Sequence, residues 1–461
     1  MTTSSAPPPA STTREHTRAL MVLGLPLIGS HLAQFAIQVT DTLMIGWYDV
    51  TALAALTVAG SVYFVIFIVG SGFAWAVMPM VASAAGTEDD RQVRRVTRMG
   101  LWLSIAFGAV MMPVLVFSEP IFLALGQEVE VARQAGIYLR VVALGLIPSL
   151  LIMCLKSYLA ALERTQVVLW VTLASAGLNA VVNYALIFGN WGAPEMGILG
   201  AAIASVSIQV AGVIGLVIYA AVVTPEYQLF RNFQRPDWEA MGRVFRLGWP
   251  IGLTNLAETG LFAASSILVG WIGVRELAAH GIALQIASAT FMVHIGLSQA
   301  VTVRAGRAYG RRDEGALRLG AGVGLALSMA FAVVTIVLFL SVPGALIGMF
   351  LAPDDPARAE ILVIGAALLA VAAVFQFVDA AQVMALGMLR GVQDTAVPMV
   401  IAGVSYWGVG LPASYVFGFV VGWGAVGVWA GLVVGLALAG VFLSVRFWGR
   451  SSRLGGVTAS P

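Results

Sequence analysis

Long apolar stretches separated by short polar connections run along almost the whole chain. Each of the twelve longest reaches the roughly 20 residues that a helix needs to cross the hydrocarbon core of a bilayer. The pattern predicts membrane-spanning helices over residues 18–46, 52–84, 98–118, 135–157, 166–188, 198–222, 244–272, 277–306, 318–342, 360–388, 396–418 and 424–446.

Composition supports a membrane protein and excludes several other classes. Charged residues make up 10% of the chain, against about 25% in soluble domains. The net charge of +2 is too small to indicate nucleic-acid binding. Cys154 is the single cysteine, which excludes an internal disulfide and a cysteine-based metal site. No glycine-rich phosphate loop is present, which argues against an ATP-driven pump, and we expect no cofactor.

The basic residues predict the orientation of the helices. If the N-terminus is cytoplasmic, all but four of the 25 Lys and Arg residues fall on the cytoplasmic side. The exceptions are Arg133, Arg140, Arg275 and Arg358. Cytoplasmic loops are enriched in Lys and Arg, so we expect both termini to be cytoplasmic.

The two halves of the chain resemble each other. Gly24 and Pro26 match Gly248 and Pro250, 224 residues later, and Gly86 matches Gly310. Further on the offset becomes 227, as in Gln166 and Gln393. Six helices per half make this a parallel repeat with an axis along the membrane normal. We expect an all-α membrane protein of 12 transmembrane helices in two pseudo-symmetric six-helix bundles. Its parts are a disordered cytoplasmic tail (1–17), an N-lobe (18–223), a cytoplasmic linker (224–242), a C-lobe (243–446) and a second tail (447–461).

Three acidic residues fall deep inside the apolar segments: Asp41, Glu258 and Asp379. A carboxylate in hydrocarbon is costly, so its presence there indicates a functional site. Three of them suggest cation binding or proton relay, and therefore a transporter. A purely structural membrane protein would have no need of them.

Polar side chains accompany each acid at helical spacing, so they share its helix face. Their amide oxygens suit a hard cation such as Na⁺, although Gln34 and Gln38 could equally serve helix–helix hydrogen bonding. No spacing of His and acids resembles a transition-metal site. The companions are Gln34 and Gln38 for Asp41, Asn255 for Glu258, and Gln376 and Gln382 for Asp379; Asn179 and Asn183 share a face of another helix.

Several motifs resemble the multidrug and toxic compound extrusion (MATE) family, in its NorM-like branch, over residues 14–450. They are Gly24-Leu-Pro26, Val39-Thr-Asp41 through Gly46, Gly248-Trp-Pro250, Ala257-Glu258, Phe375-Gln-Phe-Val-Asp379, Leu389-Arg390-Gly391 and Gly197-Ile-Leu-Gly200. The resemblance implies two bundles in a V around a central cavity. It also implies export of bulky, often cationic drugs and dyes, driven by entry of Na⁺ or H⁺ across a bacterial inner membrane.

The resemblance assigns roles to individual residues. Glu258 and Asp379 match the acidic pair that couples cations in the second lobe, where a Na⁺ site is expected, and Asp41 matches the first-helix acid. Asn179 and Asn183 fall on a polar pair that completes a first-lobe ion site in some members. There the second position is often Asp, so Asn183 departs from that pattern. Phe35, Phe262, Phe291 and Phe375 are candidates to line the substrate cavity.

Other classes fit less well. A lipid-linked saccharide flippase of a related fold would favour basic residues in its cavity, and the sequence places no Arg or Lys in the middle of a helix. A major facilitator drug/H⁺ antiporter is disfavoured by the register of the repeat. A membrane-embedded enzyme would need a nucleophile with a base, or a metal cluster, and we find neither. We expect a functional monomer in contact only with membrane lipid and small-molecule substrates.

Overall fold

The computed structural model describes residues 12–354 and 356–454. Within them, 12 helices are long and apolar enough to span a membrane, which confirms the sequence prediction. The spans are α1 Thr13–Tyr48, α2 Val50–Gly86, α3 Asp90–Val116, α5 Val129–Ala161, α6 Thr165–Phe188, α7 Ile198–Val223, α8 Trp238–Ile272, α9 Val274–Gly310, α10 Glu314–Ser341, α12 Arg358–Gly391, Ala396–Val420 and Gly424–Ser451. The eleventh span joins α13 Ala396–Gly403, the π-helix η3 Val404–Gly410, α14 Leu411–Tyr415 and the π-helix η4 Val416–Val420, and the twelfth joins α15 Gly424–Arg446 to the π-helix η5 Phe447–Ser451.

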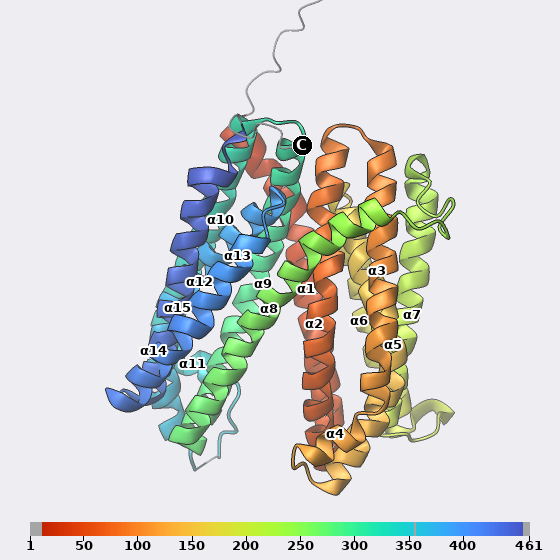
Figure 1. Cartoon of the computed structure of the whole chain (residues 1–461). Coiled ribbons are helices and arrows are strands. Elements are labelled where there is room, and N and C mark those ends of the chain that lie inside the picture. Colours follow the sequence, from red (N-terminus) through yellow and green to blue (C-terminus); the bar gives the residue numbers. More distant parts are fainter. Residues whose placement is uncertain (1–11, 355, 455–461) are drawn as a thin grey trace, which may run out of the picture.

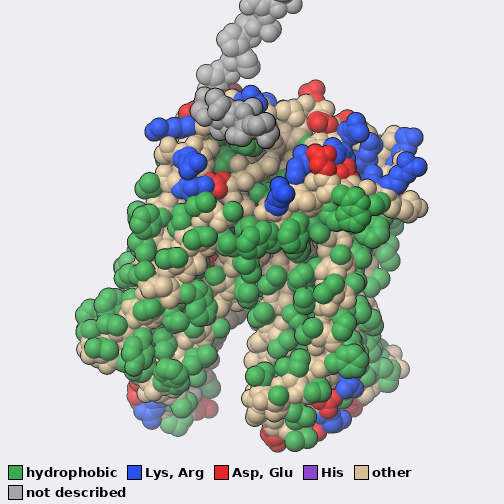
Figure 2. Space-filling view, in the orientation of Figure 1, with side chains coloured by type: hydrophobic (Ala, Val, Ile, Leu, Met, Phe, Trp, Pro, Cys, Tyr) green, Lys and Arg blue, Asp and Glu red, His purple; other side chains and the backbone are tan. Residues whose placement is uncertain are grey.

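The helices form two bundles that make a V (Figure 1). Helices α1 to α7 build the first bundle and α8 to α15 the second. The bundles meet at the end of the molecule where Lys and Arg side chains gather, which we call the basic end. A gap separates them at the opposite end (Figure 2). Most contacts between the bundles are made by α2 with α8 and α9 and by α1 with α9, and fewer by α3 with α8 and α1 with α10.

The structure differs from the sequence prediction at the ends of the chain and at two short helices. Helix α1 begins at Thr13 because Thr12 and Glu15 form a capping box, so part of the expected disordered tail at 1–17 is helical. Residues 1–11 and 455–461, which we predicted to be tail, lie outside the described residues. Helices α4 (Glu119–Ala124) and α11 (Pro343–Gly348) were not predicted. They begin 224 residues apart and therefore belong to the repeat.

The connection between the bundles is anchored to α3. Arg98 donates hydrogen bonds to the carbonyl oxygens of Arg231 and Arg235, and Trp102 donates one to that of Phe233. Arg95 donates to Asp237, the residue that caps α8. The guanidinium of Arg95 lowers the pKa of Asp237 to about 2. These contacts fix the start of α8 against the first bundle.

Glycines allow the backbones of the two bundles to touch at the basic end. A Cβ on Gly72 of α2 would lie 2.4 Å from the carbonyl oxygen of Gly248 and 2.5 Å from the nitrogen of Gly252, both on α8. The matching position in the second half is Gly296 of α9, and a Cβ there would lie 2.7 Å from the nitrogen of Ile28 on α1. Small residues permit this kind of close helix packing in membranes. The repeat therefore produces two equivalent backbone contacts between the bundles, and we call each of these contact regions a closure.

We expect Gly72→Ala to destabilise this closure by about 1–3 kcal/mol, because backbone atoms cannot yield to the added methyl group. The measurement is the apparent melting temperature of the purified protein. Gly60→Ala on the same helix is the matched control, since a Cβ there meets nothing within 4 Å. Equal melting temperatures for the two variants would contradict the close contact.

Candidate functional site

Asp41 binds two asparagines inside the first bundle. Its Oδ1 atom accepts hydrogen bonds from Nδ2 of Asn179, at 2.6 Å, and from Nδ2 of Asn183, at 2.5 Å. Both asparagines are buried on α6, one helical turn apart, so they reach Asp41 on α1 together. Two donors on one oxygen leave Oδ2 of Asp41 able to take a proton or a cation.

The other polar residues of α1 lie apart from this cluster. Gln34 and Gln38 are exposed, and their side chains donate no hydrogen bond to another described residue. Asp41 itself is only partly buried. The face of α1 that carries these residues is therefore accessible, unlike the buried asparagine face of α6.

Glu258 and Asp379 form a second acidic site in the other bundle. Asp379 is 1% exposed, and neither of its carboxylate oxygens accepts a hydrogen bond from a described residue. The Oε1 atom of Glu258 is buried and likewise has no partner. The two carboxylates are close enough to repel each other electrostatically. Buried acids without donors are stable only when a proton or a cation neutralises them.

Arg390 contacts this site, and sequence reasoning missed it. It donates a hydrogen bond of 2.7 Å to Oδ1 of Asn255 and attracts Glu258 one turn further along α8. Its guanidinium also lies 4.9 Å from the ring centre of Trp75, on α2 of the first bundle. Arg390 follows Asp379 by eleven residues, or three helical turns, which places both on one face of α12. That spacing was the signal available in the sequence.

Although the sequence places no Arg or Lys in the middle of a helix, two basic side chains reach into the bundles. Arg390 reaches the acidic site from the end of α12, and Lys156, partly buried on α5, donates a hydrogen bond of 2.8 Å to Thr172. Both sit near a helix end in the sequence, but their long side chains extend inward along the helix. The position of a residue along its helix therefore does not show how far its side chain extends into the bundle.

Gln382 lies about one helical turn from Asp379 on α12. Gln382 donates a 2.5 Å hydrogen bond to the hydroxyl of Tyr406, and both residues are fully buried. Tyr406 lies in η3, the π-helical segment of the eleventh span. Such segments occur often at functional sites. Gln376 is also fully buried, on the same face of α12.

Two of the four candidate phenylalanines pack together. Phe262 and Phe375 pack edge to face, with ring centres 5.9 Å apart. Phe375 also packs edge to face on Trp429, with ring centres 5.6 Å apart. Trp429 donates a hydrogen bond to His280, which makes that histidine part of the packed interior. Phe35 and Phe291 are partly buried and make no ring contact with another described residue.

We expect Tyr406→Phe to destabilise the second bundle by about 1 kcal/mol, because the buried amide of Gln382 loses its partner. The apparent melting temperature of the purified protein measures the change. Tyr415→Phe provides the control, since Tyr415 is 48% exposed and its ring stacking on Phe419 needs no hydroxyl. A Tyr406→Phe protein as stable as this control would refute the hydrogen bond.

Comparisons with known proteins agree with this architecture. The sequence profile of the MatE family matches residues 26–185 and 250–416, one segment in each half of the repeat. A probable multidrug resistance protein NorM of Rhizobium meliloti (strain 1021) is 47% identical, over 94% of this chain and 93% of its own length. A probable multidrug resistance protein NorM of Agrobacterium fabrum (strain C58 / ATCC 33970) is 44% identical, over 94% and 93%.

Solved structures share the fold. A multidrug resistance MATE family transporter of the MOP superfamily, in an outward-facing conformation, superposes with a TM-score of 0.87 at 19% identity, covering 96% of this chain and 97% of the other. A MATE protein in complex with MaL6 gives a TM-score of 0.88 at 19% identity, covering 96% and 98%. The agreement extends over both bundles and so covers the whole V.

Proposed function

The chain belongs to the MATE family of multidrug efflux transporters, and we propose that it exports bulky lipophilic and cationic compounds in exchange for Na⁺ or H⁺ by alternating access. The observation that carries this proposal is the pair Glu258 and Asp379. Asp379 is buried with no hydrogen-bond donor on either oxygen, and the partly buried Glu258 has none on its buried Oε1 atom, so the pair requires a neutralising cation or proton. A site of this kind is suited to ion coupling, and nothing about it suggests covalent chemistry.

The positions of the basic residues support an orientation for the transporter. Lys and Arg gather at the end where the bundles touch (Figure 2). By the positive-inside tendency that end is cytoplasmic, and both termini are cytoplasmic with it. The gap between the bundles then opens to the outside of a bacterial inner membrane. This conformation would release substrate outward and admit the coupling cation.

The proposed organisation of the chain follows the bundles. The expected lobes, 18–223 and 243–446, extend to the observed starts of α1 at Thr13 and α8 at Trp238, and the cytoplasmic linker expected at 224–242 shortens to 224–237. Each acidic site lies within a single bundle, and the surfaces that move against each other come from the same chain. A monomer is therefore sufficient for alternating access.

Transport in this scheme rests on competition for the carboxylates. A cation or proton entering from outside neutralises Glu258 and Asp379, and a cationic substrate arriving from the cytoplasm competes for the same charges. Either ligand can shift the conformational balance only through unequal affinity for the two states. Gln34, Gln38 and the partly buried Phe262 supply polar and aromatic contacts for a large substrate, and the buried Phe375 supports the ring of Phe262.

Arg390 provides a physical connection from this competition to the bundle contact. The side chain touches Asn255 and Trp75, which lie on different bundles, and it attracts Glu258. When a cation neutralises Glu258, that attraction weakens and the guanidinium is freer to change its contact with Trp75. Occupancy of the acidic site would thereby alter the closure at the basic end.

The first test is efflux of ethidium from proteoliposomes, with Na⁺ and proton gradients imposed separately. We expect Glu258→Gln and Asp379→Asn each to reduce gradient-driven efflux more than tenfold, because each removes the charge that binds the coupling cation. Glu128→Gln is the matched control, since Glu128 is exposed and forms no ion pair with a described residue.

The gradients distinguish the possible coupling sites. Efflux driven by Na⁺ alone and abolished by both C-lobe substitutions would place Na⁺ coupling at Glu258 and Asp379. Efflux driven only by protons and damaged mainly by Asp41→Asn would place coupling in the first bundle. Absence of gradient-driven efflux of any cationic dye would exclude multidrug export.

We expect Arg390→Gln to lower the concentration of coupling cation needed for half-maximal transport by several fold. The physical reason is that a positive charge next to Glu258 opposes cation binding. Arg390→Lys keeps the charge and should leave that concentration nearly unchanged. The measurement is initial efflux rate against cation concentration. A higher half-maximal concentration for Arg390→Gln would mean that Arg390 does not weaken cation binding.

A further inference from the structure

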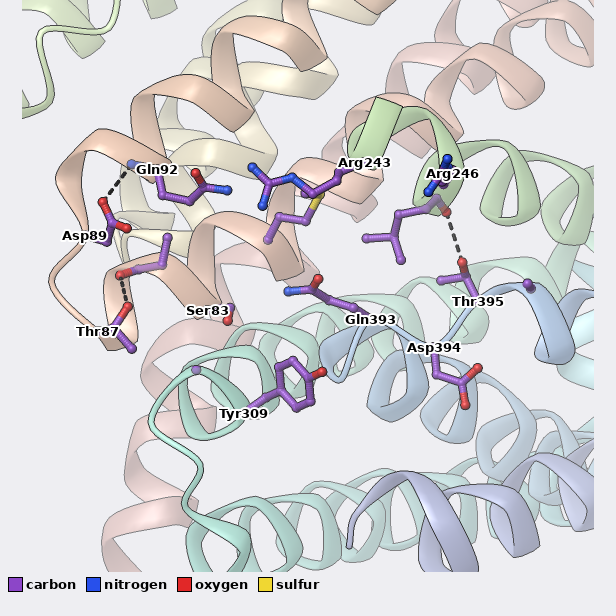
Figure 3. Close-up of a pocket in the computed structure, with 15 residues that line it drawn as sticks. Ser83, Thr87, Asp89, Gln92, Arg243, Arg246, Tyr309, Gln393, Asp394 and Thr395 are labelled. Atoms are coloured by element: carbon purple, nitrogen blue, oxygen red, sulfur yellow. Dashed lines mark hydrogen bonds between the residues drawn. The ribbon is translucent and has the colours of Figure 1, made fainter. Parts of the chain in front are cut away.

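A cavity of about 720 Å³ lies between the bundles at the basic end, away from the acidic sites (Figure 3). Its first wall comes from α2 and α3 and includes Ser83 and Gln92. The other walls come from α8, α9 and the turn after α12, and include Arg243, Tyr309 and Gln393. Volumes of this size are typical of small-molecule sites. Any ligand held there would touch both bundles.

The cavity exists because the repeat is broken at this point. On the equivalent side of the molecule, Arg304 and Arg307 of α9 reach across to Glu163, at 3.6 and 3.2 Å, and fill the space between the bundles. The residues of α2 that correspond to these arginines are Met80 and Ser83. Neither can form such a bridge, so one closure is filled by ion pairs and the other is hollow.

The hollow side has basic residues of its own, supplied by a different helix. Arg243 and Arg246 of α8 line it, at positions that hold Ala19 and Val22 in the first half. Arg246 forms no hydrogen bond or ion pair with a described residue. Arg243 has a loose ion pair with Glu239, at 3.9 Å, and donates hydrogen bonds of 2.7 and 3.1 Å to the side-chain oxygen of Gln92. The second half has therefore gained two weakly paired cations where the first half has apolar residues.

The acids in the lining do not neutralise these arginines. Asp394 is held by Arg446, at 2.7 Å, and accepts a hydrogen bond from Ser451. Asp89 caps α3 by accepting from the backbone nitrogen of Gln92. The side chains of Gln393 and Tyr309 face the cavity in Figure 3 and form no hydrogen bond with another described residue. The cavity thus offers two arginines without a close acidic partner, of which Arg246 forms no hydrogen bond with a described residue, and two uncharged polar groups with free hydrogen-bonding capacity.

We infer that this cavity binds a phosphate group, carried by an anionic phospholipid or by a small soluble phosphate compound, and that the bound phosphate holds the bundles together at the basic end. Guanidinium groups match phosphate oxygens in charge and geometry. Exposed aromatic residues, Trp238, Phe245 and Trp249, follow the same stretch of α8. Such residues mark the level of the lipid headgroups, which brings phosphate to the cavity.

The test measures ligand binding to the purified, delipidated full-length protein by native mass spectrometry and by the shift in melting temperature. The probes are phosphatidylglycerol, phosphatidylcholine and inorganic phosphate. We expect phosphatidylglycerol, phosphate or both to bind and to raise the melting temperature, and phosphatidylcholine to do so weakly. The double variant Arg243→Gln with Arg246→Gln should bind about tenfold more weakly or worse.

Two further variants separate a built site from general surface charge. Ser83→Met keeps both arginines but occupies the cavity, and it should also lose binding. The control, Arg91→Gln with Arg312→Gln, removes the same charge from exposed positions at the same end and should bind normally. Melting temperatures without ligand verify that each variant is folded.

The outcomes are distinct. If phosphatidylglycerol binds and inorganic phosphate does not, the phosphate belongs to a lipid. If inorganic phosphate also binds, the site accepts a soluble phosphate compound. Equal loss in the cavity and control variants, or full binding by Ser83→Met, would overturn the site. These readouts do not depend on transport, so a failure of the proposed efflux function would leave them interpretable.

Discussion

The close packing of backbone on backbone between the two bundles is the constraint on which the rest of the structure depends. Gly72 lies against Gly248 and Gly252, and Gly296 lies against Ile28, with no room for a side chain. Lipid surrounds the bundles, so no hydrophobic gain drives them together and close van der Waals contact must do so. Because these contacts lie at one end only, the bundles diverge toward the other end and form the V.

The cost of charge in a membrane explains the arrangement of the acidic residues. The carboxylate of Asp41 accepts hydrogen bonds from two side-chain amides on α6, whereas that of Asp379 accepts none from a described residue. The two bundles therefore hold their carboxylates in different ways, although they share one fold. The second bundle adds Arg390, which lies near Glu258 and touches Trp75 of the first bundle. An acidic site is thus connected to the contact between the bundles.

Departures from the repeat are as informative as the repeat itself. Glu163 and Gln393 occupy equivalent positions, each two residues beyond the end of its helix, α5 or α12, and each in the left-handed backbone region. Glu163 joins the bundles through Arg304 and Arg307, whereas Gln393 carries no charge and lines the cavity. That exchange removes an ion pair from one closure and leaves the cavity beside Arg243 and Arg246. The repeat gives the two closures the same backbone arrangement, and different side chains at a few positions make one closure ion-paired and the other hollow.

The sequence alone determined the twelve spans, the parallel repeat and the three intramembrane acids. These features depend on local hydropathy and on helical spacing, both of which can be read along a single chain. The capping box that starts α1 at Thr13 and the short helices α4 and α11 were also local features, but they lie beside long apolar runs that obscured them.

Only the tertiary structure decided which side chains meet across helices. Asp41 reaches Asn179 and Asn183 from 138 and 142 residues away, Arg390 turns toward Glu258, and a cavity remains where Met80 and Ser83 face Arg243. Helical periodicity gives the face of each residue but not the rotation and depth at which two helices pack. Those quantities follow from the fit of many side chains at once, and between the bundles they are also limited by the glycine contacts.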